Sequence, residues 1–326
     1  MNIRKIMIYA ELRSDSTVNS VAYELLTKAR SLFGNEANIA FIVIGNGIAG
    51  IVKDLTRSGI DAIFCMDDSR LEIYHTEYFA AAISSAVKEF CPDVLFIGAT
   101  AAGEEIAPTL GSRFNTGVAS HCVDLQIKDD VFVQMVPAFG GKVIGEIYIP
   151  NHSPQIVSVK PGIFRAETES PRECKVVDLT PGVLDEVNTS ITVTGAMQMV
   201  FEGIPVESAE VIVCGGYGLG NQQNWDKLER LASLLNAAVG CTRPVFDNGW
   251  VKEERGMIGT SCKSVRPKVY IGFGISGAAH HVCGIKDAGL IISVNRDKDA
   301  EIFSASDYKV VVDGTAVIDE LIRILE

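Results

Sequence analysis

The segment Tyr270–His281, with the sequence YIGFGISGAAHH, constrains the fold of this chain more than any other. It reads as an apolar strand, a glycine-broken turn and the start of a helix, and the apolar run Ile291–Val294 follows as a second strand. An open α/β sheet builds an anion or nucleotide site in this way at the carboxyl ends of its strands. Gly274 and Gly277 permit the tight turn, and Ser276 with the amides that follow would face the anion. The segment therefore predicts a nucleotide site.

Length and charge narrow the class of protein. A chain of 326 residues is expected to hold two domains, because single cores rarely grow much beyond about 250 to 300 residues. Acidic residues exceed basic ones by 41 to 29, which gives a formal charge of −12. Such a chain repels phosphate backbones, so no nucleic acid partner is expected.

The compartment is also predicted from the sequence. No apolar run approaches the roughly 20 residues that span a bilayer, so no membrane insertion is expected. Residues 1–11 have the pattern of a strand and lack the features of a signal peptide. The 8 cysteines contain no Cys-x-x-Cys pair, which argues against a zinc site or a disulfide scaffold. Reduced thiols in a cytoplasmic protein are the simplest interpretation.

Apolar strands alternate with helical patterns in the first third of the chain, which predicts a parallel sheet covered on both faces. The predicted strands are residues 6–9, 39–44, 62–65 and 94–97, and the predicted helices are 18–32, one through Val52 and Leu55, 79–90, and one containing Ile106. Residues 118–159 instead alternate apolar and polar side chains between turn signals at Gly140-Gly141 and Pro150-Asn151. We interpret them as an antiparallel extension of the first sheet.

The α/β alternation resumes at residue 210. It predicts strands at 210–214, 269–275, 291–294 and 310–312, with helices at 225–235 and at the C-terminus through Leu325. The expected organisation is an N-terminal three-layer α/β domain over residues 1–195, a linker over 196–208, and a doubly wound Rossmann-like domain over 209–326.

Two segments of the second domain carry glycine or arginine chemistry. Residues 213–220 resemble a dinucleotide fingerprint with irregular glycine spacing, and a tight strand-to-helix connection is an equally good interpretation. Arg243 lies between Thr242 and Pro244, a setting that can aim its guanidinium at a ring or a phosphate. The alternative is a surface arginine paired with Asp247.

Hydroxyl, imidazole and strand-end groups complete the candidate site. Ser261 can donate to a ring nitrogen, or can belong to an ordinary turn. Of His280 and His281, at most one is expected to face a ligand, because adjacent helical residues point in different directions. Asn295 and Asp313 end strands where the ligand edge is expected, although both can equally be cap or turn residues.

Taken together, these segments resemble the alpha subunit of electron transfer flavoprotein. The similar segments of the second domain are Gly215–Gly216, Thr242–Pro244, Asp247 with Gly249–Trp250, Val265–Tyr270, Gly274–Gly277 with His281, Val294–Asn295 with Asp297, Ile302–Phe303 and Asp307–Tyr308. Looser similarity covers Gly98–Thr100, Pro137–Gly141 and Pro161–Gly162 in the first domain. The resemblance therefore runs along the whole chain.

The resemblance implies an FAD held by the second domain, and a heterodimer with a beta subunit that faces the first domain. Arg243 would lie against the isoalloxazine, Ser261 near flavin N5, and His281 at the pyrimidine carbonyl. The implied cofactor-binding residues are Tyr217, Thr242, Arg243, Ile258, Gly259, Thr260, Ser261, Gly274, Ile275, Ser276, Gly277, Ala278, Ala279, His280, His281, Asn295, Asp313 and Gly314. Donors and cations beside the ring favour its reduced, negative forms.

The function that the resemblance implies is electron carriage. Electrons would pass on FAD from flavin dehydrogenases, such as acyl-CoA dehydrogenases, to an acceptor flavoenzyme or quinone reductase. The chain would be a carrier rather than an enzyme by itself, with no catalytic acid, base or nucleophile. Within the family, the alternative is an NADH-dependent bifurcating complex whose beta subunit holds a second FAD in place of AMP.

Two alternatives lie outside the family. A non-redox protein that binds adenine nucleotides would have no use for the cluster of Arg243, Ser261 and His281. A pyridine-nucleotide dehydrogenase is disfavoured by the irregular glycine spacing and by the lack of an evident catalytic pair.

Four residues depart from the family pattern near the expected flavin. Tyr217 stands where an arginine is usual, Thr260 and His280 each replace a glutamine, and Cys262 replaces a glycine. The lost arginine removes a cation from the site. We expect this cluster to alter the flavin potential or the choice of partner, with ordinary drift as the alternative.

Overall fold

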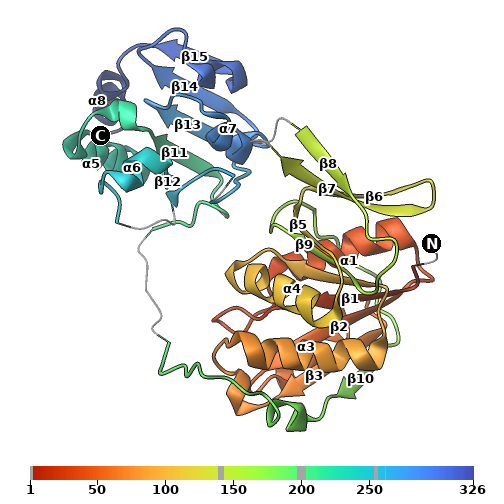
Figure 1. The fold of residues 1–326 in the computed structure, drawn as a ribbon. Coiled ribbons are helices and arrows are strands. Elements are labelled where there is room, and N and C mark those ends of the chain that lie inside the picture. The colour runs from red at the N-terminus through yellow and green to blue at the C-terminus, as the bar shows by residue number, and fades with distance from the viewer. Residues whose placement is uncertain (1–2, 139–142, 197–202, 253–255, 261) are drawn as a thin grey trace. The chain divides into compact units, whose positions relative to one another are not determined.

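The computed structural model describes residues 3–138, 143–196, 203–252, 256–260 and 262–326. These residues form two compact units (Figure 1): residues 3–138 with 143–196, and residues from 203 to 326. The division falls inside the predicted linker, residues 196–208, which we retain as a proposal. The predicted Gly140-Gly141 turn lies outside the described residues.

A parallel sheet of seven strands organises the first unit. Its order is β10-β3-β2-β1-β4-β9-β5, and every neighbouring pair runs parallel. The strands are β1 (Lys5–Tyr9), β2 (Asn38–Gly45), β3 (Ala62–Asp67), β4 (Val94–Gly98), β5 (Val118–Cys122), β9 (Gln155–Val159) and β10 (Lys175–Asp178). Central strands such as β2 are buried along almost their whole length, as their continuous apolar sequences predict.

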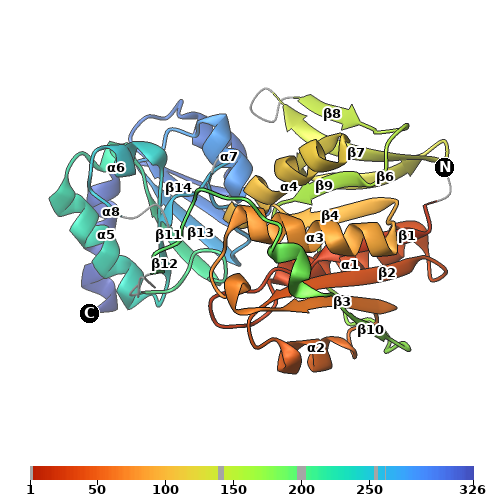
Figure 2. The same ribbon diagram turned by 60° about the horizontal axis from the view of Figure 1, so that its bottom comes forward.

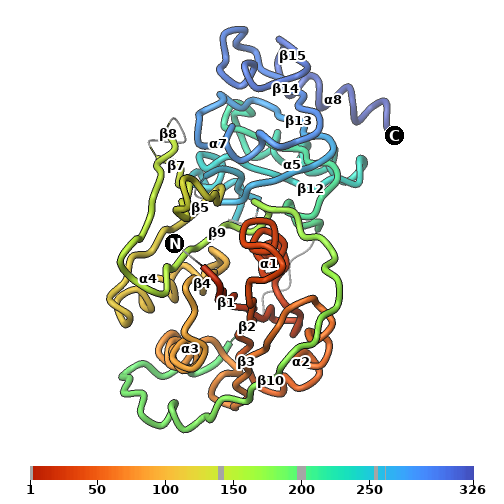
Figure 3. Tube along the Cα trace, turned by 90° about the vertical axis from the view of Figure 1, so that its right-hand side faces the viewer, coloured from red at the N-terminus to blue at the C-terminus, as the bar shows by residue number. Residues whose placement is uncertain are grey.

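Helices cover both faces of this sheet, which confirms the predicted three layers. The helices are α1 (Ser20–Phe33), α2 (Ala49–Leu55), α3 (Thr76–Phe90) and α4 (Ala101–Phe114). The residues of α1 and α2 pack into one core, and those of α3 and α4 into the other. Figure 3 shows α1 and α3 on opposite sides of β1, β2 and β3.

The predicted antiparallel strands form a sheet of their own rather than an extension of the first one. Strands β6 (Asp124–Lys128), β7 (Val131–Ala138) and β8 (Val143–Ile147) pair in that order, all antiparallel. The flanking strands β5 and β9 join the seven-stranded sheet in parallel. Alternating side chains indicate a strand with one solvated face, but they do not say which neighbour it pairs with.

The second unit is built on a five-stranded parallel sheet in the order β12-β11-β13-β14-β15. The strands are β11 (Val211–Gly215), β12 (Ala238–Cys241), β13 (Val269–Phe273), β14 (Ile291–Asn295) and β15 (Tyr308–Val311). Chain order reverses between β11 and β13, so the crevice at their carboxyl ends is the topological switch point. Doubly wound sheets bind their ligands at this point.

Two cores flank this sheet. One contains residues of α5 (Gln222–Leu234), α6 (Arg243–Asp247) and α8 (Gly314–Leu325), and the other contains residues of α7 (Ala279–Ile285). Figure 2 shows α5, α6 and α8 on one side of the strands and α7 on the other. The predicted doubly wound architecture is confirmed.

Two strands escaped prediction, β10 and β12. Both have only four residues, β10 is an edge strand with Val176 exposed, and β12 contains a glycine. Runs of this length and composition carry too little apolar periodicity to stand out. Among the described residues, no helix has the length and apolar character needed to cross a bilayer.

Candidate functional site

The turns after β11 and β13 meet backbone to backbone at the switch point. The amide of Gly216 donates to Phe273 O at 2.8 Å, and that of Gly218 to Gly274 O at 3.0 Å. A Cβ placed on Gly216 would lie 2.3 Å from Gly274 O, which no side chain tolerates. The irregular glycine spacing of residues 213–220 therefore has a structural reason, since two glycines admit the neighbouring turn.

The β13 turn depends on two further glycines. Gly274 has φ +63° and Gly277 has φ +94°, conformations that favour glycine. A Cβ on Gly277 would lie 1.9 Å from Ile302 N, in the short 3-10 helix that follows β14. Gly277 is thus required by a neighbouring segment of the protein as well as by the shape of the turn.

The amides after this turn are open to a ligand. Within the described part of the chain, the N–H groups of residues 276–280 donate to no protein acceptor. Ser276, Ala278, Ala279 and His280 are exposed. A run of free amides at the carboxyl edge of a parallel sheet suits phosphate oxygens. The turn therefore fits the pyrophosphate of a dinucleotide.

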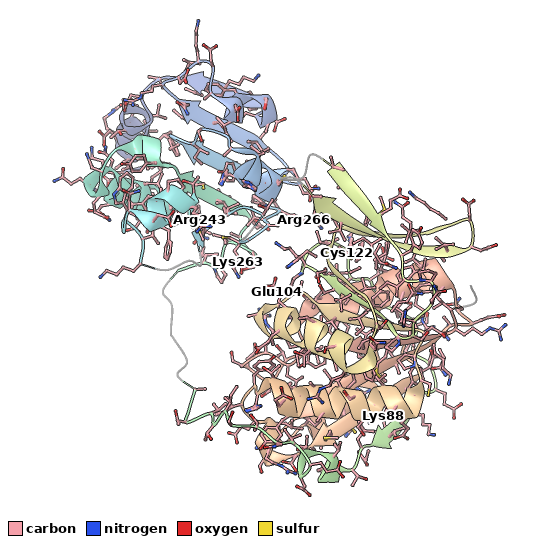
Figure 4. All side chains as sticks on the ribbon, viewed as in Figure 1. Lys88, Glu104, Cys122, Arg243, Lys263 and Arg266 are labelled. Carbon is pink, nitrogen blue, oxygen red and sulfur yellow. The ribbon has the colours of Figure 1, made fainter. Side chains whose placement is uncertain are left out.

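Arg243 supplies an accessible cation on the β12 side of the crevice. It is the first residue of α6 (Figure 4). The amide of Thr242, directly before it, donates to Gly215 O at 3.1 Å. The side chain of Arg243 is 70% exposed, and its Nε lies 3.6 Å from Asp247 Oδ2. The alternative of a surface arginine paired with Asp247 is therefore observed, as an exposed ion pair too long for a firm hydrogen bond, and contact of Arg243 with a ligand remains a prediction.

Tyr217 and Trp250 stack on each other. Their ring centroids are 5.4 Å apart with an interplanar angle of 19°. Tyr217 follows β11, and Trp250 follows α6, where its amide donates to Val245 O at 3.2 Å. Trp250 was not among the predicted site residues, although it ends the segment that Arg243 begins. Its aromatic character beside Gly249 was the available signal.

The loop after residue 257 packs against α7. The amide of Thr260 donates to His280 O at 2.9 Å, and Thr260 Oγ1 lies 3.0 Å from His280 Nδ1. A Cβ placed on Gly259, which has φ +154°, would lie 3.0 Å from His280 O, so a side chain there would be strained and would push His280 away by a few tenths of an ångström. Thr260 and His280, which both depart from the family pattern, are therefore in direct contact. Ser261 lies outside the described residues.

His281 is buried instead of facing the open edge. Its Nδ1 lies 3.0 Å from Ile258 O and its Nε2 lies 2.7 Å from the Tyr270 hydroxyl. Because a carbonyl only accepts, Nδ1 carries the proton and Nε2 accepts from Tyr270. Burial lowers the pKa of His281 to about 4, and the bond to Ile258 opposes this shift. Both ring nitrogens of His281 are therefore hydrogen-bonded to protein groups in this structure.

Acid should destabilise the second unit through His281. The folded pKa of about 4 lies below the ordinary value of 6.5, so the unfolded chain binds the proton more tightly. The stabilisation is complete above pH 6.5 and is lost as pH falls toward 4. Between pH 7 and pH 5 the loss should be about 2 kcal/mol. Urea unfolding at both pH values should show that the free energy of unfolding falls less for His281→Gln than for the wild type. An equal fall in the two proteins would contradict a buried neutral imidazole.

Asn295 and Asp313 hold the edge together. Asn295 Nδ2 donates to Ile275 O at 2.8 Å, and its Oδ1 accepts from Asp297 N at 2.9 Å. Asp313 caps α8 by accepting from Thr315 N at 2.9 Å, next to Gly314. Both residues lie where the sequence placed them, at the carboxyl ends of β14 and β15. The alternative that they are strand-end or cap residues is observed, and their contact with a ligand remains a prediction.

Thiol and metal chemistry find no support in this unit. Burial raises the pKa of Cys241 to about 12 and raises that of Cys214 further, so both stay protonated. The described residues contain no group of three His, Cys, Asp or Glu side chains able to hold a metal ion. None of the eight cysteines, all of which lie in the described part of the chain, forms a disulfide.

The first sheet has a switch point too, between β1 and β4, but its chemistry is unsuited to phosphate. Glu11 follows β1 and accepts from the Thr100 hydroxyl at the start of α4. Thr100 also accepts from Gly103 N at 3.0 Å. A carboxyl group there competes for the donors that a phosphate would need and, when ionised, repels it. The nucleotide site therefore belongs to the second unit.

The fold and site together define a dinucleotide-binding α/β protein with an exposed cation, Arg243, at the carboxyl edge of its second sheet. Comparison with known families agrees. Residues 6–183 match the electron transfer flavoprotein domain, and residues 205–286 match the electron transfer flavoprotein FAD-binding domain. The free amides of the β13 turn and the exposed Arg243 fit FAD, with its pyrophosphate and its electron-accepting ring.

Individual relatives agree along the whole chain. The chain is 36% identical to an electron transfer flavoprotein subunit alpha of Thermoanaerobacterium thermosaccharolyticum, over 98% of this chain and 97% of the relative. It is 32% identical to a FixB protein of Clostridium saccharobutylicum, over 99% and 97%. It is 29% identical to subunit LctC of a lactate dehydrogenase (NAD(+),ferredoxin) of Acetobacterium woodii, over 99% and 77%. The chain belongs to the electron transfer flavoprotein alpha-subunit family.

Proposed function

We propose that this alpha subunit pairs with a beta-type chain, holds one FAD in its second unit, and carries electrons between flavoenzymes. The donors would be flavin dehydrogenases such as acyl-CoA dehydrogenases, and the acceptor another flavoenzyme or a quinone reductase. FAD, when bound, takes up and releases one or two electrons. The observation that carries the proposal is an exposed guanidinium at the same sheet edge as a run of free amides.

The residues of this chain bind and bias the cofactor rather than transform a substrate. The amides of residues 276–280 would hold the pyrophosphate, and Arg243 would lie against the ring and favour its negatively charged forms. Asn295 fixes the β13 turn through its bond to Ile275 O. His281, bonded to Ile258 O, fixes the loop that leads to Ser261. Direct donation from His281 to the pyrimidine carbonyl would require its ring nitrogens to change partners.

A bifurcating complex is a second candidate, favoured by the similarity to the LctC subunit of a lactate dehydrogenase (NAD(+),ferredoxin). In that arrangement the beta-type partner would hold a second FAD that takes electrons from NADH, and the FAD of this chain would relay them. In a conventional carrier the partner would hold AMP instead. The two arrangements differ in flavin content and in their response to NADH.

The deciding experiment is an absorption spectrum of the chain co-expressed with its beta-type partner. We expect a flavin spectrum, with one FAD and one AMP released per heterodimer on denaturation, and bleaching under stepwise chemical reduction. Two FAD per heterodimer with bleaching by NADH would identify the bifurcating arrangement. A colourless heterodimer that added FAD cannot reconstitute would refute both.

A further inference from the structure

Tyr217 and Trp250 form a two-layer aromatic surface at the carboxyl edge of the five-stranded sheet. Trp250 is half-buried and packs against the core formed with α5 and α8. Tyr217 stacks on it with 5.4 Å between centroids and is still 53% exposed. An aromatic side chain backed by a second ring, with much of its own surface open, is typical of a platform for a flat ligand.

The backbone fixes this platform beside the predicted ring position. Tyr217 lies between Gly216 and Gly218, the two glycines locked against the turn after β13. Trp250 closes the segment that Arg243 opens, held by bonds from its own amide to Val245 O and from Gly249 N to Phe246 O at 2.8 Å. The platform and the cation therefore come from the same two strand ends, β11 and β12.

The chemistry of the platform opposes that of the arginine. The faces of phenol and indole carry negative electrostatic potential, so they attract a neutral, electron-poor ring and repel an anion. Oxidised isoalloxazine is neutral and electron-poor, whereas its reduced forms in such sites are negative.

We propose that this platform, Tyr217 backed by Trp250, is a stacking wall for the isoalloxazine. The wall favours oxidised flavin over negatively charged reduced flavin. This inference rests on the proposed function, because it needs FAD in the second unit. Arg243 and the wall then set the flavin potential in opposite directions. The wall makes the bound flavin a stronger reductant than it would be in the variant Tyr217→Arg.

The test compares substitutions of Tyr217 in the purified heterodimer carrying FAD. Tyr217→Arg should strengthen the binding of reduced flavin relative to oxidised flavin by about tenfold, which raises a one-electron potential by about 59 mV. Tyr217→Phe keeps the aromatic face and should match the wild type in potential. Tyr217→Leu should raise the potential less than arginine does, and should increase flavin fluorescence because contact with a phenol quenches it.

Tyr308→Ala is the matched control. Tyr308 is also an exposed tyrosine of this unit, at 61%, but it lies at the start of β15 and so at the opposite edge of the sheet. Its removal should leave potential and fluorescence unchanged. If the wild type binds FAD but Tyr217→Leu keeps both the emission and the potential, the wall is refuted and the carrier function stands. A wild type that binds no FAD refutes both.

Discussion

Arg243→Ala should leave the fold intact and lower the flavin potential sharply. The side chain is 70% exposed and its only neighbouring carboxylate among the described residues lies 3.6 Å away, so its loss should change the free energy of unfolding by less than about 0.5 kcal/mol. A guanidinium that bonds a negative ring contributes about 1.5 to 3 kcal/mol, against about 0.5 to 1.5 kcal/mol for an ordinary hydrogen bond, so the difference is about 1 to 1.5 kcal/mol. Reduced flavin should therefore bind about fivefold to tenfold less tightly relative to oxidised flavin.

Expressed as a one-electron potential, this is a fall of about 40 to 60 mV. Spectroelectrochemical titration of the heterodimer measures this fall in flavin potential. Added salt should reduce the fall only a little if the ring excludes water from its contact with the guanidinium. The chain offers a matched control in Arg323, which is also 70% exposed and pairs with a carboxylate of its own helix, Glu320. Arg323→Ala should not move the potential. An unchanged potential in Arg243→Ala would remove this residue from the site.

The strands and helices that the sequence predicted well are those with long apolar runs. Strands β2 and β13 and helix α3 are buried along one or both faces, and burial is what their periodicity records. The pairing of β6, β7 and β8 into a separate sheet could not be predicted, because alternation specifies a face and not a neighbour.

Much of the candidate site could be placed from strand ends alone. Parallel strands bring their carboxyl ends to one edge, so Gly274 and Asn295 had to lie at the same edge once their strands were predicted. Arg243 follows β12, a strand that escaped prediction, so its place at this edge came only from the structure. The contacts that side chains make at this edge could not be predicted from strand ends. His281 turned inward because Tyr270 and Ile258, distant in sequence, offer its ring two partners. The Tyr217–Trp250 stack likewise joins segments that local patterns do not connect.

Gly277→Ala should cause the largest loss of stability in the second unit. At φ +94° an L-residue is strained by about 1 to 2 kcal/mol, and a Cβ 1.9 Å from Ile302 N forces the backbone to move at a further cost of about 1 to 3 kcal/mol. The turn must shift away from the 3-10 helix at Glu301–Ala305, and the free amides of residues 276–280 shift with it. FAD affinity should fall together with stability.

Gly220→Ala is the control that separates backbone strain from steric clash in Gly277→Ala. Gly220 has a similar φ of +87°, but a Cβ placed there meets nothing within 4 Å, so it carries the backbone strain without the clash. Urea unfolding should therefore rank wild type above Gly220→Ala and Gly220→Ala above Gly277→Ala, with FAD retained by the first two. Equal losses for the two variants would mean that strain alone acts at Gly277. The Ile302 contact would then have no part in shaping the turn, and the phosphate-binding geometry would depend on φ alone.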